Sequence, residues 1–338
     1  MTAPAPKSLA RARELVTPVL AAAAESLSPE LRHFVGYHWG WVDARGEPLR
    51  AAAGKALRPT LAMLSAEAVG AAADHARAAA AAVELIHDFT LLHDDVMDGD
   101  RERRHRPTTW VTFGVGQAIC AGDALVLLAQ RVLIEDPSET RLAALAALGE
   151  AAAEVIAGQV LDLSFEGRLD VPLDAYLAMA ARKTGALLAC SASIGAILVG
   201  GDAAAVGALR EFGAALGLAF QAVDDWLGIW GRTERTGKPV ASDLRQRKAS
   251  LPVVFALGAE GAAARELRAR LAEGPPADEA ALAEAVGLLE ACGAEARTRA
   301  EAQRQIEAAR AALASAPIAR AARAELLELA SFVVEREL

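Results

Sequence analysis

Apolar residues recur at spacings of three and four through most of the chain, in long segments that prolines and glycines separate. This periodicity is typical of helices that bury one face against a core. We predict helices near residues 6–26, 51–70, 74–99, 115–134, 139–168, 172–200 and 203–230, with three or four more after residue 250.

The regions between these helices are less regular. Residues 33–48 show no clear period and predict an ordered connection, whereas the polar residues 231–250 predict a lid-like surface loop. Residues 184–201 carry no charge, but they are only weakly apolar, which favours a buried central helix over a membrane span. We find no linker or repeat, so we predict one domain over residues 1–338, with 279–338 forming C-terminal packing helices.

Composition strengthens the helical prediction. Alanine, leucine, glutamate and arginine are abundant, and only 4% of residues are aromatic. We therefore expect an all-α protein, a single large helical bundle around a central cavity. The chain has 35 basic and 44 acidic residues and a net charge of −9, which argues against binding nucleic acid through a broad basic surface.

Other features bear on redox state and location. Cys120, Cys190 and Cys292 are isolated and lack the spacing of a zinc site or a disulfide framework, so we expect core thiols. The first 20 residues lack the uninterrupted apolar stretch of a secretory signal. We predict a cytoplasmic protein with no transmembrane segment.

The most informative segment, residues 84–108, contains the acidic cluster Asp94, Asp95 and Asp98. Asp94 and Asp98 are four residues apart and share a helix face, where their charges repel each other unless a cation is bound. Oxygen ligands in an open arrangement suit Mg²⁺, which keeps several waters and shares itself with substrate phosphates. The cluster thus predicts a phosphate-bearing substrate, although a helix end with solvated acids is the alternative.

A second acidic pair, Asp224 and Asp225, lies in an apolar helix after Phe220 and Gln221. Two acidic helices can face each other across a bundle and hold metal ions between them. The alternative for Asp224 is a buried carboxylate with a local partner. Basic residues that could bind phosphate oxygens accompany both clusters: Lys55, Arg58, Arg103, Arg104, Lys183, Lys238 and Lys248, with His87 two helical turns before Asp94.

As an ordered set, these motifs resemble the polyprenyl (isoprenyl) diphosphate synthases, the class I trans-prenyltransferases. The resemblance is strongest over residues 54–252 and rests on GKALRP (54–59), HDFTLLHDDVMD (87–98) with the arginines that follow, GQVLDL (158–163), Lys183 with Thr184, FQAVDD (220–225) and the lysine-bearing segment 236–252. It implies the isoprenoid synthase type of helical bundle, a homodimer, and an enzyme that condenses isopentenyl diphosphate with an allylic diphosphate and releases diphosphate.

The resemblance also implies a role for each matching residue. The isopentenyl diphosphate site would comprise Lys55, Arg58, His87 and Arg104. The allylic diphosphate site would comprise Arg103, Lys183, Thr184, Gln221, Lys238 and Lys248. The Mg²⁺ ions, three with the substrate, would be bound by Asp94, Asp95, Asp98, Asp224 and Asp225. The residues expected to carry catalysis are Asp94, Asp98, Asp224, Lys183 and Lys238.

Two positions depart from the family pattern. Gly228 stands where the second motif usually has its last aspartate, so we expect reduced or reorganised metal binding without loss of activity. His105 stands where a glycine commonly follows the arginine pair.

Product length should depend on the residues just before Asp94. Phe89 is expected to form the floor of the prenyl pocket, while the small Thr90 leaves room beside it. The alternative is that both side chains simply pack the helix and an opposing helix sets the depth. The resemblance is closest to geranylgeranyl diphosphate synthases, with a farnesyl diphosphate synthase as the alternative. A noncatalytic subunit, which Gly228 favours, and a terpene cyclase, which would not need the second basic site, are further alternatives.

Overall fold

The computed structural model describes residues 5–49, 54, 56–231 and 240–335. Within them the chain is all-α, as predicted, apart from one short hairpin of β1 (Glu102–Arg103) and β2 (Arg106–Pro107). The first half contains α1 (Lys7–Glu25), α2 (Pro29–Trp39), α3 (Leu57–Ala68), α4 (Arg77–Met97), α5 (Thr109–Phe113), α6 (Val115–Ile134) and α7 (Glu139–Phe165). The second half contains α8 (Leu173–Ala180), the π-helical turn η2 (Ala181–Gly185), α9 (Ala186–Leu198), α10 (Ala203–Trp230), α12 (Ser242–Arg245), α13 (Leu251–Leu257), α14 (Ala262–Glu273), α15 (Glu279–Ala291), α16 (Ala294–Ala314) and α17 (Arg320–Glu335).

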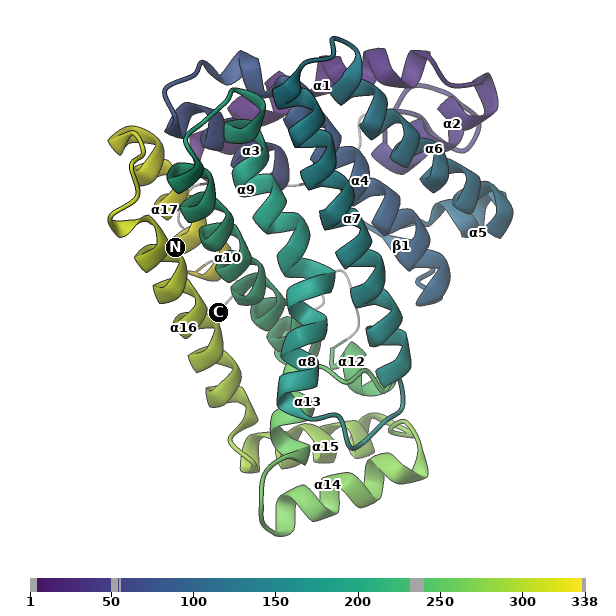
Figure 1. Cartoon of the computed structure of the whole chain (residues 1–338). Helices are drawn as coiled ribbons and strands as arrows, with labels where there is room; N and C mark the ends of the chain where they lie inside the picture. The colour runs from purple at the N-terminus through teal and green to yellow at the C-terminus, as the bar shows by residue number, and fades with distance from the viewer. Residues whose placement is uncertain (1–4, 50–53, 55, 232–239, 336–338) are drawn as a thin grey trace.

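Helix α9 runs through the middle of the bundle and packs against α3, α7 and α10 (Figure 1). Its small residues permit close approach of backbones. A Cβ on Gly195 would lie 1.9 Å from the carbonyl oxygen of Ala62, so only glycine fits there. This packing explains why residues 184–201 carry no charge, and it confirms the predicted buried central helix.

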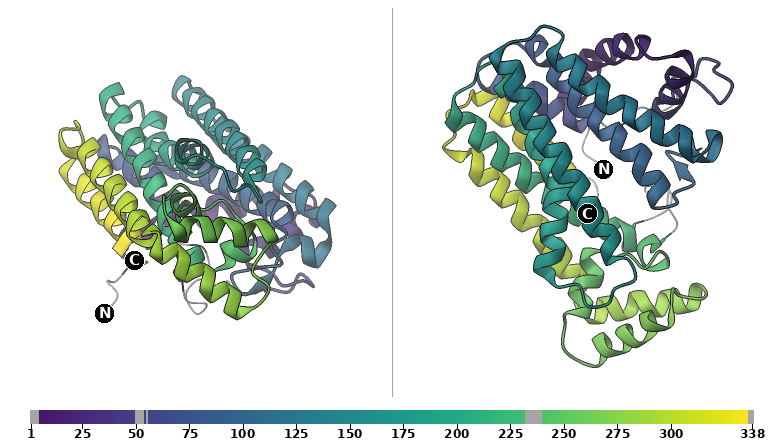
Figure 2. Two further views of the ribbon diagram at one scale, coloured as in Figure 1. Left: turned by 90° about the horizontal axis from the view of Figure 1, so that it is seen from below. Right: turned by 45° about the vertical axis from the view of Figure 1, so that its right-hand side comes forward.

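The remaining long helices surround this centre. Helix α4 packs between α6, α3 and α1, while α16 covers the other side of α10. Helices α14 and α15 lie together at one end of the bundle, as both views in Figure 2 show. The predicted bounds of α6 and α10 match the structure, and five helices follow residue 250 where three or four were expected.

One predicted segment is corrected, and another contains a local variation. The connection expected over residues 33–48 begins inside α2, whose start is capped by the Ser28 hydroxyl. At its end the indole of Trp39 donates a 2.7 Å hydrogen bond to Asp88 of α4, so tertiary contacts specify a helix that lacks a clear period. The single helix expected over 172–200 is confirmed as a continuous helical stretch from Leu173 to Leu198, in which η2 forms a π-helical turn.

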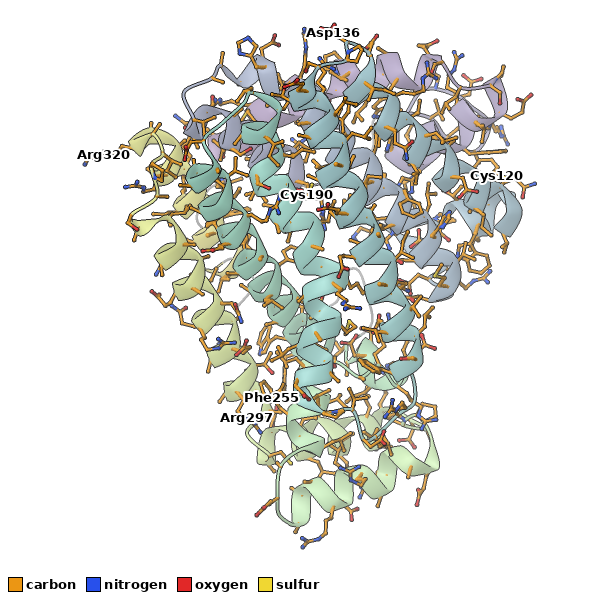
Figure 3. The ribbon with its side chains drawn as sticks, viewed as in Figure 1. Cys120, Asp136, Cys190, Phe255, Arg297 and Arg320 are labelled. Carbon is orange, nitrogen blue, oxygen red and sulfur yellow. The ribbon has the colours of Figure 1, made fainter. Side chains whose placement is uncertain are left out.

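The cysteines differ in their surroundings. Cys190 is buried on α9, and Cys292 is partly exposed. Cys120, also expected in the core, is exposed on the outer side of α6 (Figure 3). Apolar neighbours in sequence did not reveal which face of the helix it would take.

Three helices are long and apolar enough to cross a membrane by length and composition: α6, α7 and α10. All three belong to the bundle, and between 33% and 44% of their most apolar windows are buried within it.

Candidate active site

A cavity of about 620 Å³ opens between α3, α4, α7, α8, η2 and α10, and the segment 243–250 closes one side of it. Its size is ordinary for a small-molecule site. The charged and polar side chains that line it include Arg58, Glu84, His87, Thr90, Asp94, Asp98, Arg103, Arg104, Asp162, Lys183, Thr184, Gln221, Asp224, Asp225, Asp243 and Lys248. The two acidic turns therefore face one cavity. Lys55 and Lys238 lie outside the described residues.

Asp94 and Asp98 come from the last turns of α4, one turn apart on the face towards the cavity. Burial raises the pKa of Asp94 to about 6, and the charge of Asp98 adds to the shift while Lys183 opposes it. Asp98 is paired with Lys248 at 2.8 Å across the cavity. The wall is thus rich in carboxylates whose ionised forms a cation would stabilise.

Asp95, which was expected to bind metal, does not line this cavity. It is 2% exposed, and its Oδ1 accepts from Arg103 Nε at 2.8 Å and lies 2.7 Å from Nη2. Successive helix residues are turned by about 100°, which carries Asp95 away from the face of its neighbour Asp94. Asp95 therefore orients Arg103, which itself reaches the cavity, and the expected role of Asp95 as a metal ligand stays a prediction.

Both members of the second acidic pair line the cavity, but they differ in burial. Asp224 is exposed to the cavity, whereas Asp225 is buried and its carboxylate accepts hydrogen bonds from protein donors. Asp225 accepts from the Tyr176 hydroxyl, from Gln221 Nε2 at 2.7 Å and from the Leu251 amide at 2.6 Å. Burial, followed by the charge of Asp243, raises the pKa of Asp225 to about 7. Asp225 therefore holds Gln221 and the start of α13 in place, and its expected role as a metal ligand stays a prediction.

On another part of the wall, Arg58, His87 and Arg104 line the cavity together with Glu84, whose charge interacts with both arginines. Gly54 permits this arrangement, because a Cβ there would lie 2.8 Å from Arg104 Nη2. Burial lowers the pKa of Arg58 to about 10, which leaves it charged at neutral pH. Burial and the neighbouring arginines lower the pKa of His87 well below its usual value, so the imidazole is neutral there.

Lys183 and Thr184 line the cavity from the π-helical turn η2. This turn packs against α7 and α10. A Cβ on Gly158 would lie 2.3 Å from the Lys183 amide nitrogen, so α7 needs glycine at this crossing. Lys183 pairs with Asp162, and Thr184 donates to Gln221. The sequence pattern around Asp162 did not predict this pairing, because its partner Lys183 lies 21 residues away.

The residues expected to set product length also separate. Thr90 and Leu91 line the cavity, as does Phe220. Phe89 does not: it is 8% exposed and packs edge-on against His93, with ring centroids 4.8 Å apart. Its side chain belongs to the apolar core that α4 forms with α6, the alternative to a pocket floor, and its effect on product length stays a prediction.

The family model for polyprenyl synthetases matches residues 41–289, a wider span than the 54–252 inferred from the motifs. The chain belongs to the polyprenyl synthetase family. Members are prenyltransferases, so the protein is an enzyme of isoprenoid biosynthesis.

Individual relatives agree with the family. The crystal structure of a polyprenyl synthetase from Streptomyces coelicolor superposes with a TM-score of 0.93 at 47% identity, covering 97% of this chain and 99% of that one. A (2E,6E)-farnesyl diphosphate synthase of Mycobacterium tuberculosis is 50% identical over 78% of this chain and 74% of its own. A geranylgeranyl diphosphate synthase of the same organism is 47% identical over 77% and 75%.

Polyprenyl synthetases depend on Mg²⁺ as a family. Within the described part of this chain, no three His, Cys, Asp or Glu side chains are close enough to hold a metal unaided. An open set of carboxylates fits Mg²⁺, because this ion usually takes one or two carboxylates and completes its shell with water and substrate phosphate. Asp94, Asp98 and Asp224 fit that requirement.

Proposed function

We propose that this polyprenyl synthetase is a Mg²⁺-dependent prenyl diphosphate synthase that condenses isopentenyl diphosphate with an allylic diphosphate and makes geranylgeranyl diphosphate. The observation that carries the proposal is the shared cavity. The acidic turns of α4 and α10 line it together with the basic pocket of Arg58, His87 and Arg104. A terpene cyclase needs only one diphosphate site, so the second basic pocket favours a condensing enzyme.

The allylic diphosphate is assigned to the acidic side of the cavity. Asp94, Asp98 and Asp224 would hold Mg²⁺, three ions with the substrate in all. When bound, the metal supplies stabilisation of the charge on the departing diphosphate. Arg103 and Lys183, each fixed by a carboxylate partner, bind the same leaving group by charge-assisted hydrogen bonds.

The chemical step breaks the allylic C–O bond, and its electron pair leaves with the diphosphate. The double bond of isopentenyl diphosphate then attacks the allylic cation, and the released diphosphate takes the proton lost from the new chain. Arg58, Arg104 and neutral His87 hold the incoming diphosphate in place for this attack. The ring of Phe220 lines the cavity, where its face can stabilise the cation.

The twenty-carbon product is supported by Thr90, a small side chain on the cavity wall, and by similarity to the geranylgeranyl diphosphate synthase. The similarity to the farnesyl diphosphate synthase favours a fifteen-carbon product as the second candidate. Incubating the purified protein with Mg²⁺, isopentenyl diphosphate and each allylic starter, then weighing the products by mass spectrometry, distinguishes the two. Absence of any condensation product would refute the proposed activity.

We further propose that the protein is a homodimer. Large apolar side chains are exposed along α6 and α7: Val115, Ile119, Leu127, Ile134, Leu142, Ile156 and Val160. Burying such a surface against a second copy removes it from water. Sedimentation should give twice the 35.1 kDa chain mass, and Leu127→Glu should give monomers, whereas Leu173→Glu on α8 should not. A monomeric wild-type protein would contradict this assignment.

The same surface bears on location. Because α6 and α7 are two of the three long apolar helices, their exposed side chains require either a partner chain or a lipid environment. We propose a cytoplasmic dimer, and cell fractionation tests it. Recovery of the protein in the membrane pellet after a carbonate wash would instead favour insertion of these helices.

A further inference from the structure

Gly228 lies on α10 four residues after Asp224, so the two positions share a helix face one turn apart. At this position α10 contributes no side chain, and hence no third carboxylate from its own motif. Asp224 is the exposed acid of this turn. Asp225 is buried and accepts hydrogen bonds from Tyr176, Gln221 and the Leu251 amide.

A carboxylate from another element occupies the space beside Gly228. A Cβ built on Gly228 would lie 2.2 Å from Asp243 Oδ2, 2.5 Å from its Cγ and 2.7 Å from its Oδ1. Cβ contacts below 3.0 Å essentially never occur, so a side chain at residue 228 would require the Asp243 carboxylate to move from this position. Asp243 also lines the cavity that Asp224 enters.

The element that carries Asp243 is anchored to the bundle. Ala241 and Leu244, on either side of it, are 0% and 1% exposed. The backbone oxygen of Asp243 accepts from the Lys248 amide at 2.9 Å, and Ser242 Oγ lies 3.5 Å from the Gly228 carbonyl oxygen. The buried residues on both sides of Asp243 therefore hold its side chain next to α10.

We propose that Asp243 supplies the carboxylate that the second acidic motif lacks, so that Asp224 and Asp243 together face the Mg²⁺–diphosphate complex. This inference rests on the proposed function and gives the metal site a composite wall, with one acid from α10 and one from α12. It also explains why glycine at position 228 is compatible with an intact site: the absent side chain makes room for Asp243.

The test compares full-length variants by titrating Mg²⁺ into protein with inorganic diphosphate in a calorimeter. Asp243→Asn should weaken Mg²⁺ binding about tenfold, the scale seen when residues around a metal site are altered. Gly228→Ala should weaken it as well, because the new methyl group displaces the Asp243 carboxylate. Gly228→Asp combined with Asp243→Gly should restore affinity by returning the acid to α10.

Asp136→Asn is the matched control, since this exposed aspartate lies at the far end of the bundle (Figure 3). It should bind Mg²⁺ as the wild type does, and circular dichroism should show all variants folded. Wild-type affinity in Asp243→Asn would overturn the inference, as would a double variant as weak as Asp243→Asn. Failure of the wild type to form any prenyl product would instead refute the proposed function, so the two failures are distinguishable.

Discussion

Replacing Asp95 by asparagine separates the two roles that adjacent aspartates play on α4. Asp95 is 2% exposed and pairs with Arg103, whose side chain is 29% exposed. Removing one partner of a buried ion pair costs about 3–5 kcal/mol. Asparagine keeps one acceptor oxygen and Arg103 can reach water, so we expect a loss of about 2 kcal/mol.

That loss has a measurable thermal consequence. An unfolding entropy of about 2.1 cal/mol/K per residue gives roughly 0.7 kcal/mol/K for a chain of this length, so the melting temperature should fall by about 3 °C. With Arg103 no longer held, KM for the allylic diphosphate should rise about tenfold, equivalent to about 1.4 kcal/mol of binding. The Mg²⁺ concentration for half-maximal activity should stay within about twofold of wild type, because Asp95 does not face the cavity.

Asp94→Asn is the matched comparison, one residue away on the same helix. It should lower kcat at least about 100-fold and raise the Mg²⁺ requirement, since metal stabilisation of the leaving group is worth several kcal/mol. Steady-state kinetics at varied Mg²⁺ and varied allylic substrate measure both effects. If Asp95→Asn shifted the Mg²⁺ requirement as Asp94→Asn does, the division of roles between these residues would be wrong.

Three further outcomes follow from the structure. Thr90→Phe places a ring on the cavity wall and should shorten the main product, which product chromatography measures. Phe89→Ala removes a buried ring and should lower the melting temperature. An unchanged product with Thr90→Phe, or an unchanged melting temperature with Phe89→Ala, would contradict these placements. His105 has a φ of +60°, a backbone conformation that glycine adopts more readily. His105→Gly should therefore raise the free energy of unfolding by about 0.5–1 kcal/mol in urea. A lower free energy of unfolding would show that His105 is not strained. Burial raises the pKa of Cys190 to about 12, so iodoacetamide at pH 8 should label it only after unfolding; labelling of native Cys190 would contradict its burial.

The sequence predicted the helices because these depend on local periodicity. Asp94, Asp98 and Asp224 could be placed on one cavity from spacing within their own helices and from family resemblance. Helix α2 was missed because Trp39 is held through Asp88, a contact across 49 residues.

The finer assignments depended on contacts that spacing does not reveal. Asp95 and Phe89 lie in the same motif as Asp94, and only the folded structure shows that Asp95 pairs with Arg103 and that Phe89 packs against His93. Asp243 carries no metal-like spacing to Asp224, and its place beside Gly228 arises because α12 packs against the end of α10. Such pairings come from tertiary structure and not from the local pattern.

In the proposed reaction, one cavity holds the metal-bound allylic diphosphate and the incoming isopentenyl diphosphate on opposite sets of side chains. A crystal structure with Mn²⁺, a non-ionisable allylic diphosphate analogue and isopentenyl diphosphate tests it most directly. Anomalous density should place metal between Asp94 or Asp98 and Asp224, with the second diphosphate on Arg58, His87 and Arg104. Metal bound away from these acids, or both diphosphates on one side, would contradict the claim.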